Sequence, residues 1–367
     1  MACYLPRTQL QSLLDILQQQ GYDCIGPQVR DGAIVYESLN AASQLPTGVQ
    51  DQQSPGQYRL IENDSLRHFS WANGPQAIKP QVFAPRETLW RVQQDSHEQT
   101  CQLKFETAAP ASVMIAVLGV RACDIAALRL QDQHFLESEY CDPYYAARRE
   151  GLFLIAVNCS HPAATCFCHS TGDGPNASGN FDLCLDELDE GFVIEAGSDA
   201  GQALLNQLEL KVATQEHVQQ AAQQYQLAIQ QQRRLPKKNL RNILFEQLEH
   251  PRWDEIAQRC LSCGNCTAVC PTCFCHSEQE LPSLDGSHSE HVRQWDSCFT
   301  LGHSYIHGMT IREDTRLRYR QWLTHKLAGW HDQYGRSGCV GCGRCISWCP
   351  VGIDLTEEVT AICGESD

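Results

Sequence analysis

Cysteine is the residue type that carries most of the chemistry in this 367-residue chain, which contains 21 of them. Two runs, CLSCGNCTAVCP and CVGCGRCISWCP, share one spacing of four cysteines followed by a proline. Secreted proteins held by many disulfides are short and carry a signal peptide, whereas thiolates in a reducing compartment bind zinc or build iron–sulfur clusters. The first ten residues, MACYLPRTQL, lack the basic and apolar regions of a signal peptide. We therefore expect a cytoplasmic protein whose cysteines ligate metal.

The spacing of the two runs favours iron–sulfur clusters over zinc. C-x2-C-x2-C-x3-C-P is the bacterial [4Fe–4S] pattern, in which three thiolates wrap one cluster and the fourth ligates the other cluster. Zinc ribbons instead pair two C-x2-C knuckles about 15–20 residues apart, which leaves the third and fourth cysteines of each run unexplained. We therefore predict two [4Fe–4S] clusters with crossed ligands. One takes Cys260, Cys263, Cys266 and Cys349, and the other takes Cys339, Cys342, Cys345 and Cys270.

The hexapeptide TCFCHS occurs twice, at residues 165–170 and 272–277, and the first copy lies among further cysteines. It follows an expected strand at 152–157, and another cysteine follows an expected strand at 113–118. If these strands are parallel neighbours, their C-terminal ends bring the cysteines to one edge of the sheet. We predict a third [4Fe–4S] cluster there, on Cys123, Cys159, Cys166 and Cys168. Asp124 is a reserve oxygen ligand, and a redox dithiol or a zinc site are the alternatives.

The second copy of the hexapeptide has fewer partners. It supplies Cys273 and Cys275, because Cys270 already belongs to the predicted dicluster site. Cys298 is the one obvious third thiolate, and His276 is a candidate non-cysteine ligand for a further centre. Free cysteine is also among the most buried residue types, and we favour the interpretation that these thiols pack beside the clusters.

Composition narrows the class of protein. The hydrophobic content of 42% is typical of a globular chain. The formal net charge of −16 repels phosphate backbones and argues against nucleic acid as a partner. The apolar run at 113–118 is far too short to span a bilayer, so we expect no membrane span.

The chain divides into three regions of different texture. Residues 1–198 mix helical patterns with strand-like runs, such as a helix at 8–20 and a strand at 33–37, which predicts an α/β or α+β domain with a partly parallel sheet. Residues 199–250 form a polar connector, in which a glutamine-rich stretch predicts a surface helix. Residues 251–367 are rich in cysteine and lack strand-like runs, which predicts an all-α, ferredoxin-like dicluster domain.

A cluster of basic residues lies between the two cysteine runs. It comprises Arg312, Arg316, Arg318, Arg320, His325 and Lys326. In an acidic protein such a cluster compensates the negative charge of the clusters or forms a docking patch, and a solvated basic face is the plainer alternative.

Several segments together resemble a known family. They are, in order, GVRACDIAAL, DPYYAARRE, NCSHPAATCFCHSTGDGP, CLSCGNCTAVCPTCFC, RYRQWLTHK and GCVGCGRCISWCPVGID. They resemble the β subunit of the cytosolic sulfhydrogenase-type [NiFe] hydrogenases and the corresponding iron–sulfur subunit of anaerobic sulfite reductase, which form one family of 4Fe–4S dicluster proteins. GVRACD is also similar to the flavin-containing β subunits of coenzyme F420 hydrogenases. The resemblance begins near residue 110 and is weak before it.

The resemblance implies an electron-transfer subunit of a larger complex. Such a subunit works beside a reductase subunit that carries FAD and binds NAD(P)H. The terminal catalyst is a [NiFe] centre on hydrogenase small and large subunits, or a sirohaem on a sulfite reductase subunit. This chain has no nickel-binding CxxC pair at its ends and no G-x-G-x-x-G fingerprint, so we expect catalysis on the partners. We favour the hydrogenase complex, with the sulfite reductase and a flavin-binding oxidoreductase as alternatives.

Overall fold

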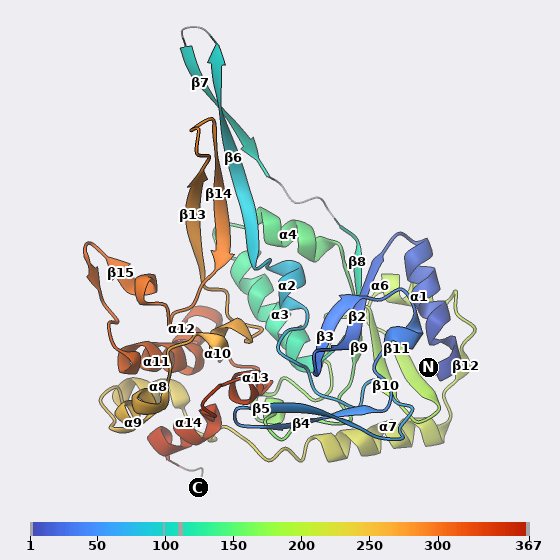
Figure 1. The fold of residues 1–367 in the computed structure, drawn as a ribbon. Helices are drawn as coiled ribbons and strands as arrows, with labels where there is room; N and C mark the ends of the chain where they lie inside the picture. Colours follow the sequence, from blue (N-terminus) through green and yellow to red (C-terminus); the bar gives the residue numbers. More distant parts are fainter. Residues whose placement is uncertain (1–2, 98–99, 109–112, 365–367) are drawn as a thin grey trace.

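The structure, a computed structural model, describes residues 3–97, 100–108 and 113–364. An eight-stranded sheet forms the centre of the N-terminal part (Figure 1). In spatial order its strands are β12 (Lys211–Val212), β1 (Cys3–Pro6), β11 (Gly191–Ala196), β10 (Leu183–Glu187), β9 (Leu152–Val157), β8 (Ile115–Val120), β2 (Asp23–Arg30) and β3 (Ala33–Ser38). The four strands from β10 to β2 run parallel, and the outer neighbours pair antiparallel. The prediction of a partly parallel sheet is therefore confirmed.

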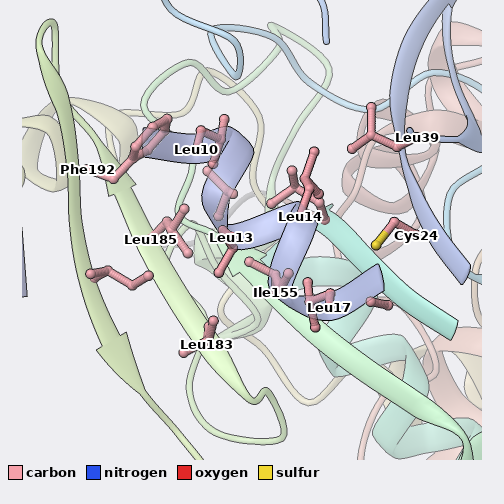
Figure 2. Packing of buried hydrophobic residues seen from close by; sticks show 14 of the residues in the cluster. Leu10, Leu13, Leu14, Leu17, Cys24, Leu39, Ile155, Leu183, Leu185 and Phe192 are labelled. Atoms are coloured by element: carbon pink, nitrogen blue, oxygen red, sulfur yellow. The ribbon is translucent and has the colours of Figure 1, made fainter. Parts of the chain in front are cut away.

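Helices cover both faces of this sheet. They are α1 (Leu10–Gln19), α3 (Ala122–Phe135), α4 (Pro143–Glu150) and α6 (Asp199–Leu205). The leucines of α1 recur at helical spacing and form one buried stripe, which packs against Ile155 and Leu183 (Figure 2). Successive side chains of a strand point to opposite faces, so Leu154 packs on the other side, in a core with Ile125 and Leu128 of α3. The sheet is thereby buried on both sides.

A second sheet has four antiparallel strands, two from the first third of the chain and two from the last third. Its strands, in order, are β13 (His276–Pro282), β14 (His288–Trp295), β6 (Arg86–His97) and β7 (Thr100–Thr107). It projects from the body of the molecule (Figure 1). The prediction of an all-α C-terminal region is therefore wrong, because β13 and β14 lie within it. Their sequences, HSEQELP and HSEHVRQW, are polar on both faces and lack the apolar alternation by which a strand is recognised.

The rest of the chain after the first sheet is largely helical. The helices are α7 (Gln215–Ala228), α8 (Leu240–Glu246), α9 (Arg252–Arg259), α10 (Asn265–Ala268), α11 (Thr315–Thr324), α12 (Trp330–Tyr334), α13 (Arg344–Ser347) and α14 (Leu355–Cys363). The glutamine-rich stretch lies in α7, as predicted. A core that includes Trp253, Tyr319, Trp322 and Val359 holds α9, α11 and α14 together around several cysteines. In the described part of the chain, no helix has both the length and the apolar character that a membrane span requires.

Small hairpins and short helices complete the fold. The hairpin of β4 (Val49–Ser54) and β5 (Gln57–Glu62) lies beside α13, and β15 (Tyr305–Ile306) pairs with β16 (Met309–Thr310). The short helices α2 (Lys79–Val82) and α5 (Cys168–Thr171) lie next to cysteine-bearing loops. One sheet contains strands from residues 1–198 and from residues 251–367, so it crosses the predicted boundaries. The division of the chain into three regions stays a prediction.

Candidate metal centres

The first set of predicted ligands lines one cavity. Cys260, Cys263 and Cys266 of the first run and Cys349 of the second run all border it, in a space of about 450 Å³ between atoms, and so does Cys345 of the second set. Cys260 lies at the C-terminal end of α9 and Cys266 lies in α10. Backbone N–H groups point at the sulfurs, since Ser262 N donates to Cys260 Sγ at 3.4 Å and Ile353 N donates to Cys349 Sγ at 3.3 Å.

The walls of this cavity are apolar and aromatic. They include Phe299, Tyr319 and Trp322, all of which belong to the core of the C-terminal part. Gly264 has a φ of +73°, a left-handed conformation that favours glycine and turns the chain between two of the cysteines. The Cys263 side chain is exposed, so one corner of this site reaches the protein surface.

The four cysteines predicted for the second cluster also lie close together. Cys339, Cys342 and Cys345 lie on the loop that ends in α13, and Cys270 follows α10. Burial raises the pKa of the Cys345 thiol, and the sulfurs around it, including that of Cys270, raise it further. Lys326 is buried beside these sulfurs, where its ammonium donates to Thr272 Oγ1 at 2.7 Å. Burial alone would lower the pKa of Lys326, but the neighbouring sulfurs raise it, so a positive charge faces this site.

The two sets adjoin each other. Besides burial, the Cys270 sulfur of the second set raises the pKa of the Cys266 thiol of the first, and the Cys266 sulfur raises the pKa of the Cys345 thiol. Helices α10 and α13, which carry these loops, are in contact. An electron carrier held at one set would therefore neighbour a carrier held at the other.

The spacing of the thiols bears on the kind of metal. Within the described ranges, no group of three or more His, Cys, Asp and Glu side chains is gathered closely enough to hold one metal ion. A tetrahedral zinc site draws its sulfurs to about 2.3 Å from a single ion. A four-iron cubane holds its thiolates farther apart, because each one binds a different iron. The choice of the cubane over zinc therefore rests on the C-x2-C-x2-C-x3-C-P spacing of the two runs.

The four cysteines predicted for a third cluster also come together. Strands β8 and β9 are parallel neighbours, so the loops after them share one edge of the sheet. Cys123 begins α3, Cys159 follows β9, and Cys166 and Cys168 lie at the start of α5. Burial raises the pKa of the Cys168 thiol to about 12, with the nearby sulfur of Cys159 acting in the same direction. Burial also raises the pKa of the Cys166 and Cys123 thiols, and the nearby Cys168 sulfur acts in the same direction on both.

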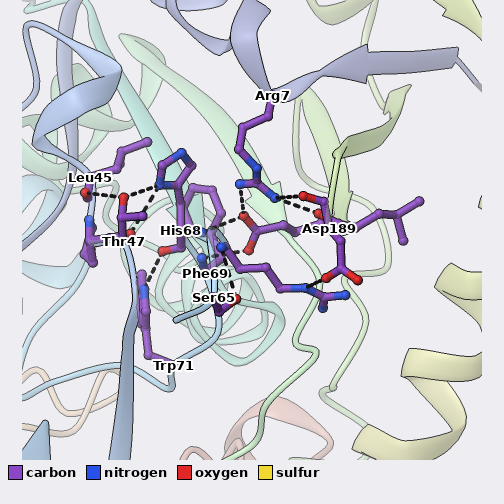
Figure 3. A network of polar contacts seen from close by, with 12 residues as sticks. Arg7, Leu45, Thr47, Ser65, His68, Phe69, Trp71 and Asp189 are labelled. Atoms are coloured by element: carbon purple, nitrogen blue, oxygen red, sulfur yellow. Dashed lines mark hydrogen bonds and ion pairs between the residues drawn. The ribbon is translucent and has the colours of Figure 1, made fainter. Parts of the chain in front are cut away.

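A buried arginine supports this third set. Arg121 is 1% exposed, and its guanidinium donates to Phe69 O at 2.8 Å and to Trp71 O at 2.7 Å. It also hydrogen-bonds to Cys159, which lowers the pKa of that thiol against the larger effect of burial. The segment that carries Phe69 and Trp71 is itself fixed, because Glu187 accepts from the backbone N–H groups of His68 and Phe69 (Figure 3).

The loops of the second and third sets interlock. Phe167 N donates to Gly341 O at 2.8 Å. A Cβ at Gly341 would lie 2.5 Å from Cys168 N, and one at Gly343 would lie 2.5 Å from Thr165 O, so this approach requires glycine at both positions. The Cys342 sulfur of the second set accordingly raises the pKa of the Cys166 and Cys168 thiols of the third. The second set therefore lies next to both the first set and the third set.

The reserve role that the sequence indicated for Asp124 is wrong. Its carboxylate accepts two hydrogen bonds from Arg344, at 2.9 and 2.8 Å, and a third from Asn73. Both side chains of this ion pair are at most 2% exposed. The acid therefore holds α3 to α13 between the second and third sets, and both of its oxygens are engaged in these contacts.

The structure brings the second TCFCHS copy together with Cys298, as the sequence suggested, but it does not bring His276 to these thiols. Cys273 hydrogen-bonds to Cys270, and Cys275 hydrogen-bonds to Cys298. The nearby imidazole is that of His303, whereas His276 contacts Phe274 O and lies against the Phe83 ring. His303 was not among the predicted residues. Its segment, DSCFTLGHS, offers only a loose signal, with an acid, a thiol and an imidazole within nine residues.

The basic cluster does not act as a unit. Arg316 and Arg320 pair with Glu249 on the surface, so they are neutralised within the chain. Arg318 and Lys326 instead lower the pKa of nearby cysteine thiols, Cys260 and Cys339, against the larger effect of burial. These two residues of the cluster therefore compensate charge at the cysteine sets.

Comparisons with known proteins match the cysteine-rich region and most of the chain. Family models described as 4Fe-4S dicluster domain match residues 259–353 and 219–274. The chain is 30% identical over 311 residues to "Sulfhydrogenase 2 subunit beta" of Pyrococcus furiosus, an alignment that covers 83% of this chain and 89% of that protein. No solved structure matches the chain.

Proposed function

Because the chain belongs to the 4Fe–4S dicluster family of sulfhydrogenase β subunits and is thus an iron–sulfur electron-transfer subunit, we propose that it connects a flavin-containing reductase to a [NiFe] hydrogenase. In this proposal the reductase subunit holds FAD and takes electrons from NAD(P)H, and the hydrogenase small and large subunits hold nickel and iron. The complex works in the cytoplasm. The observation that carries the proposal is the crossed gathering of the two cysteine runs in a continuous series with a third set.

The ligands proposed for the two dicluster sites follow the crossed spacing. They are Cys260, Cys263, Cys266 and Cys349 for one cluster, and Cys339, Cys342, Cys345 and Cys270 for the other. Bound [4Fe–4S] clusters supply one-electron transfer at these positions. The aromatic wall of Phe299, Tyr319 and Trp322 excludes water from the first site. Lys326 supplies a buried positive charge at the second, and the exposed Cys263 gives the first site a face to the surface.

Two alternatives keep the same role for the cysteines. In one, the partner is a sirohaem sulfite reductase; in the other, the N-terminal domain binds a flavin itself. Copurification with a nickel protein supports the hydrogenase complex, and copurification with a sirohaem protein supports the sulfite reductase. A flavin absorbance in the chain purified alone would favour the third alternative.

The purified chain is expected to take up electrons without turning over a substrate. On reduction its two dicluster sites should give two interacting S = 1/2 signals in electron paramagnetic resonance, because these two reduced clusters lie close together. It should neither oxidise hydrogen nor reduce sulfite when assayed alone. Substantial turnover of either substrate by the single subunit would contradict the proposal.

We also propose a third [4Fe–4S] cluster on Cys123, Cys159, Cys166 and Cys168. Three cubanes would give about twelve irons per chain, as against about eight for two. Replacing Cys166 and Cys168 together by alanine should therefore remove about four irons and leave the dicluster signals in place. The measurement is iron analysis of anaerobically purified protein, with paramagnetic resonance on the same samples.

A matched control for this prediction is the Cys184→Ala variant. Cys184 is a buried cysteine of β10 that faces the α3 side of the sheet and lies outside all three sets. Its replacement should leave the iron content unchanged. An iron content of about eight in the unsubstituted chain, unchanged in the double variant, would show that the third set holds no cluster.

A further inference from the structure

Two thiols outside the three sets meet at the base of the projecting sheet. Cys275 directly precedes β13 and Cys298 follows β14, so the pairing of these strands brings them together. The last hydrogen bond of the hairpin joins Asp296 N to Cys275 O at 2.9 Å. The two sulfurs are hydrogen-bonded to each other, and both side chains are half-buried rather than enclosed.

An imidazole and a carboxylate complete this group. His303, on the short 3-10 helix Leu301–Ser304, hydrogen-bonds to Cys275, and its Nδ1 lies 3.3 Å from Asp296 Oδ2. The hydrogen bond from Cys298 lowers the pKa of the Cys275 thiol to about 4. The hydrogen bond from His303 also lowers this pKa, whereas burial raises it. The Cys275 sulfur and Asp296 raise the pKa of His303. A half-exposed thiolate beside a cation is the environment of reactive cysteines, whereas structural cysteines are inert and neutral.

Two simpler explanations of this group fail. A metal ion would need three or more donors drawn together, and no such group lies within the described ranges. Packing alone would leave two neutral thiols in an apolar core, but here Cys275 contacts an imidazole that is oriented by an acid. Of the other thiols nearby, Cys270 is assigned to the second cluster and Cys273 hydrogen-bonds to Cys270, so Cys275 and Cys298 are left as a pair.

We propose that Cys275 and Cys298 form a redox-active dithiol that closes to a disulfide. On oxidation the two sulfurs bond to each other while the pair releases two electrons and two protons; reduction reverses each change. His303 holds one of the protons beside Cys275, and Asp296 orients the ring as a positioning residue. The electrons pass singly to or from one-electron carriers, which in the protein are [4Fe–4S] clusters.

The position of the pair fits this exchange. The Cys266 sulfur of the first set raises the pKa of the Cys298 thiol, while Lys326, which lies beside the second set, lowers the pKa of Cys275. A two-electron dithiol beside two one-electron sites can take one electron from each. This supply of electrons rests on the proposed function, although the dithiol itself does not.

The test follows the disulfide directly in the full chain, purified anaerobically with its iron intact. Samples are equilibrated in oxidised and reduced dithiothreitol at a series of ratios, and free thiols are then blocked with N-ethylmaleimide in denaturant. Peptide mapping by mass spectrometry should find a Cys275–Cys298 link, lighter by two hydrogens, that appears with a two-electron slope. Reduced methyl viologen should open it. The Cys184→Ser variant should keep the link, since Cys184 lies in the first sheet.

Absence of this link at every ratio, in protein with full iron content, would overturn the dithiol while leaving the proposed function standing. Protein without iron would count against the proposed function instead. The variant His303→Gln separates reactivity from folding: it should slow alkylation of Cys275 near pH 6 about tenfold and shift its pH profile upward. An unchanged profile would remove His303 from the pair.

Discussion

Replacing Cys349 by alanine is expected to remove the cluster of the first cysteine run, although Cys349 belongs to the second. Cys349 borders the same cavity as Cys260, Cys263 and Cys266, and its sulfur accepts from Ile353 N there. A cubane left with three thiolates has an open iron and is lost, so about four irons per chain should disappear. Paramagnetic resonance of the reduced protein should lose the signal of this cluster, together with its interaction with the cluster of the second set.

The reciprocal variant and a control make this result specific. Cys270→Ala should remove the other cluster, because Cys270 lies among Cys339, Cys342 and Cys345. Cys363→Ala is the control, since Cys363 is a buried cysteine at the end of α14, in the same core but outside every set. If Cys349→Ala kept all of its iron, or if Cys363→Ala lost as much, the crossed assignment would be contradicted.

The dicluster sites could be proposed from the sequence because the local spacing of the cysteines limits how their thiolates can reach a cluster. Three thiolates on one tight loop and a fourth after three further residues leave few arrangements around a cubane. The third set required one step more, namely that the strands at 113–118 and 152–157 are parallel neighbours. That step is confirmed, because alternating strands and helices in one chain favour a parallel sheet, and β8 and β9 do pair in parallel.

Other features depended on contacts that no local pattern encodes. β14 pairs with β6, although their sequences are separated by most of the chain, and its polar faces give no strand signal. Arg344 and Asp124 are 220 positions apart, so the local sequence around the acid indicates only a spare ligand. His303 reaches Cys275 because the hairpin of β13 and β14 folds the chain back.

The second large effect concerns the buried ion pair of Arg344 and Asp124. Arg344→Met is expected to destabilise the protein by about 3–5 kcal/mol, because it leaves the Asp124 charge buried without its partner. Arg344 donates both of its terminal nitrogens to that carboxylate, and both side chains are almost completely enclosed. The measurement is the urea midpoint of unfolding followed by tryptophan fluorescence, compared among variants of equal iron content.

Two further variants decide whether the effect comes from the charge or from the shape. Arg241→Met removes an exposed pair with Asp332, whose side chains are 43% and 54% exposed, and should leave the urea midpoint nearly unchanged, because solvent screens such a pair. The double variant Asp124→Leu with Arg344→Met removes both charges, so it should recover much of the loss, since well-packed apolar replacements of buried pairs are often neutral. If the double variant is as unstable as Arg344→Met, then hydrogen bonds from Arg344 to Gly74 O and from Asn73 to Asp124 matter more than the charges. If Arg344→Met costs no more than Arg241→Met, this pair does not hold the second and third cysteine sets together.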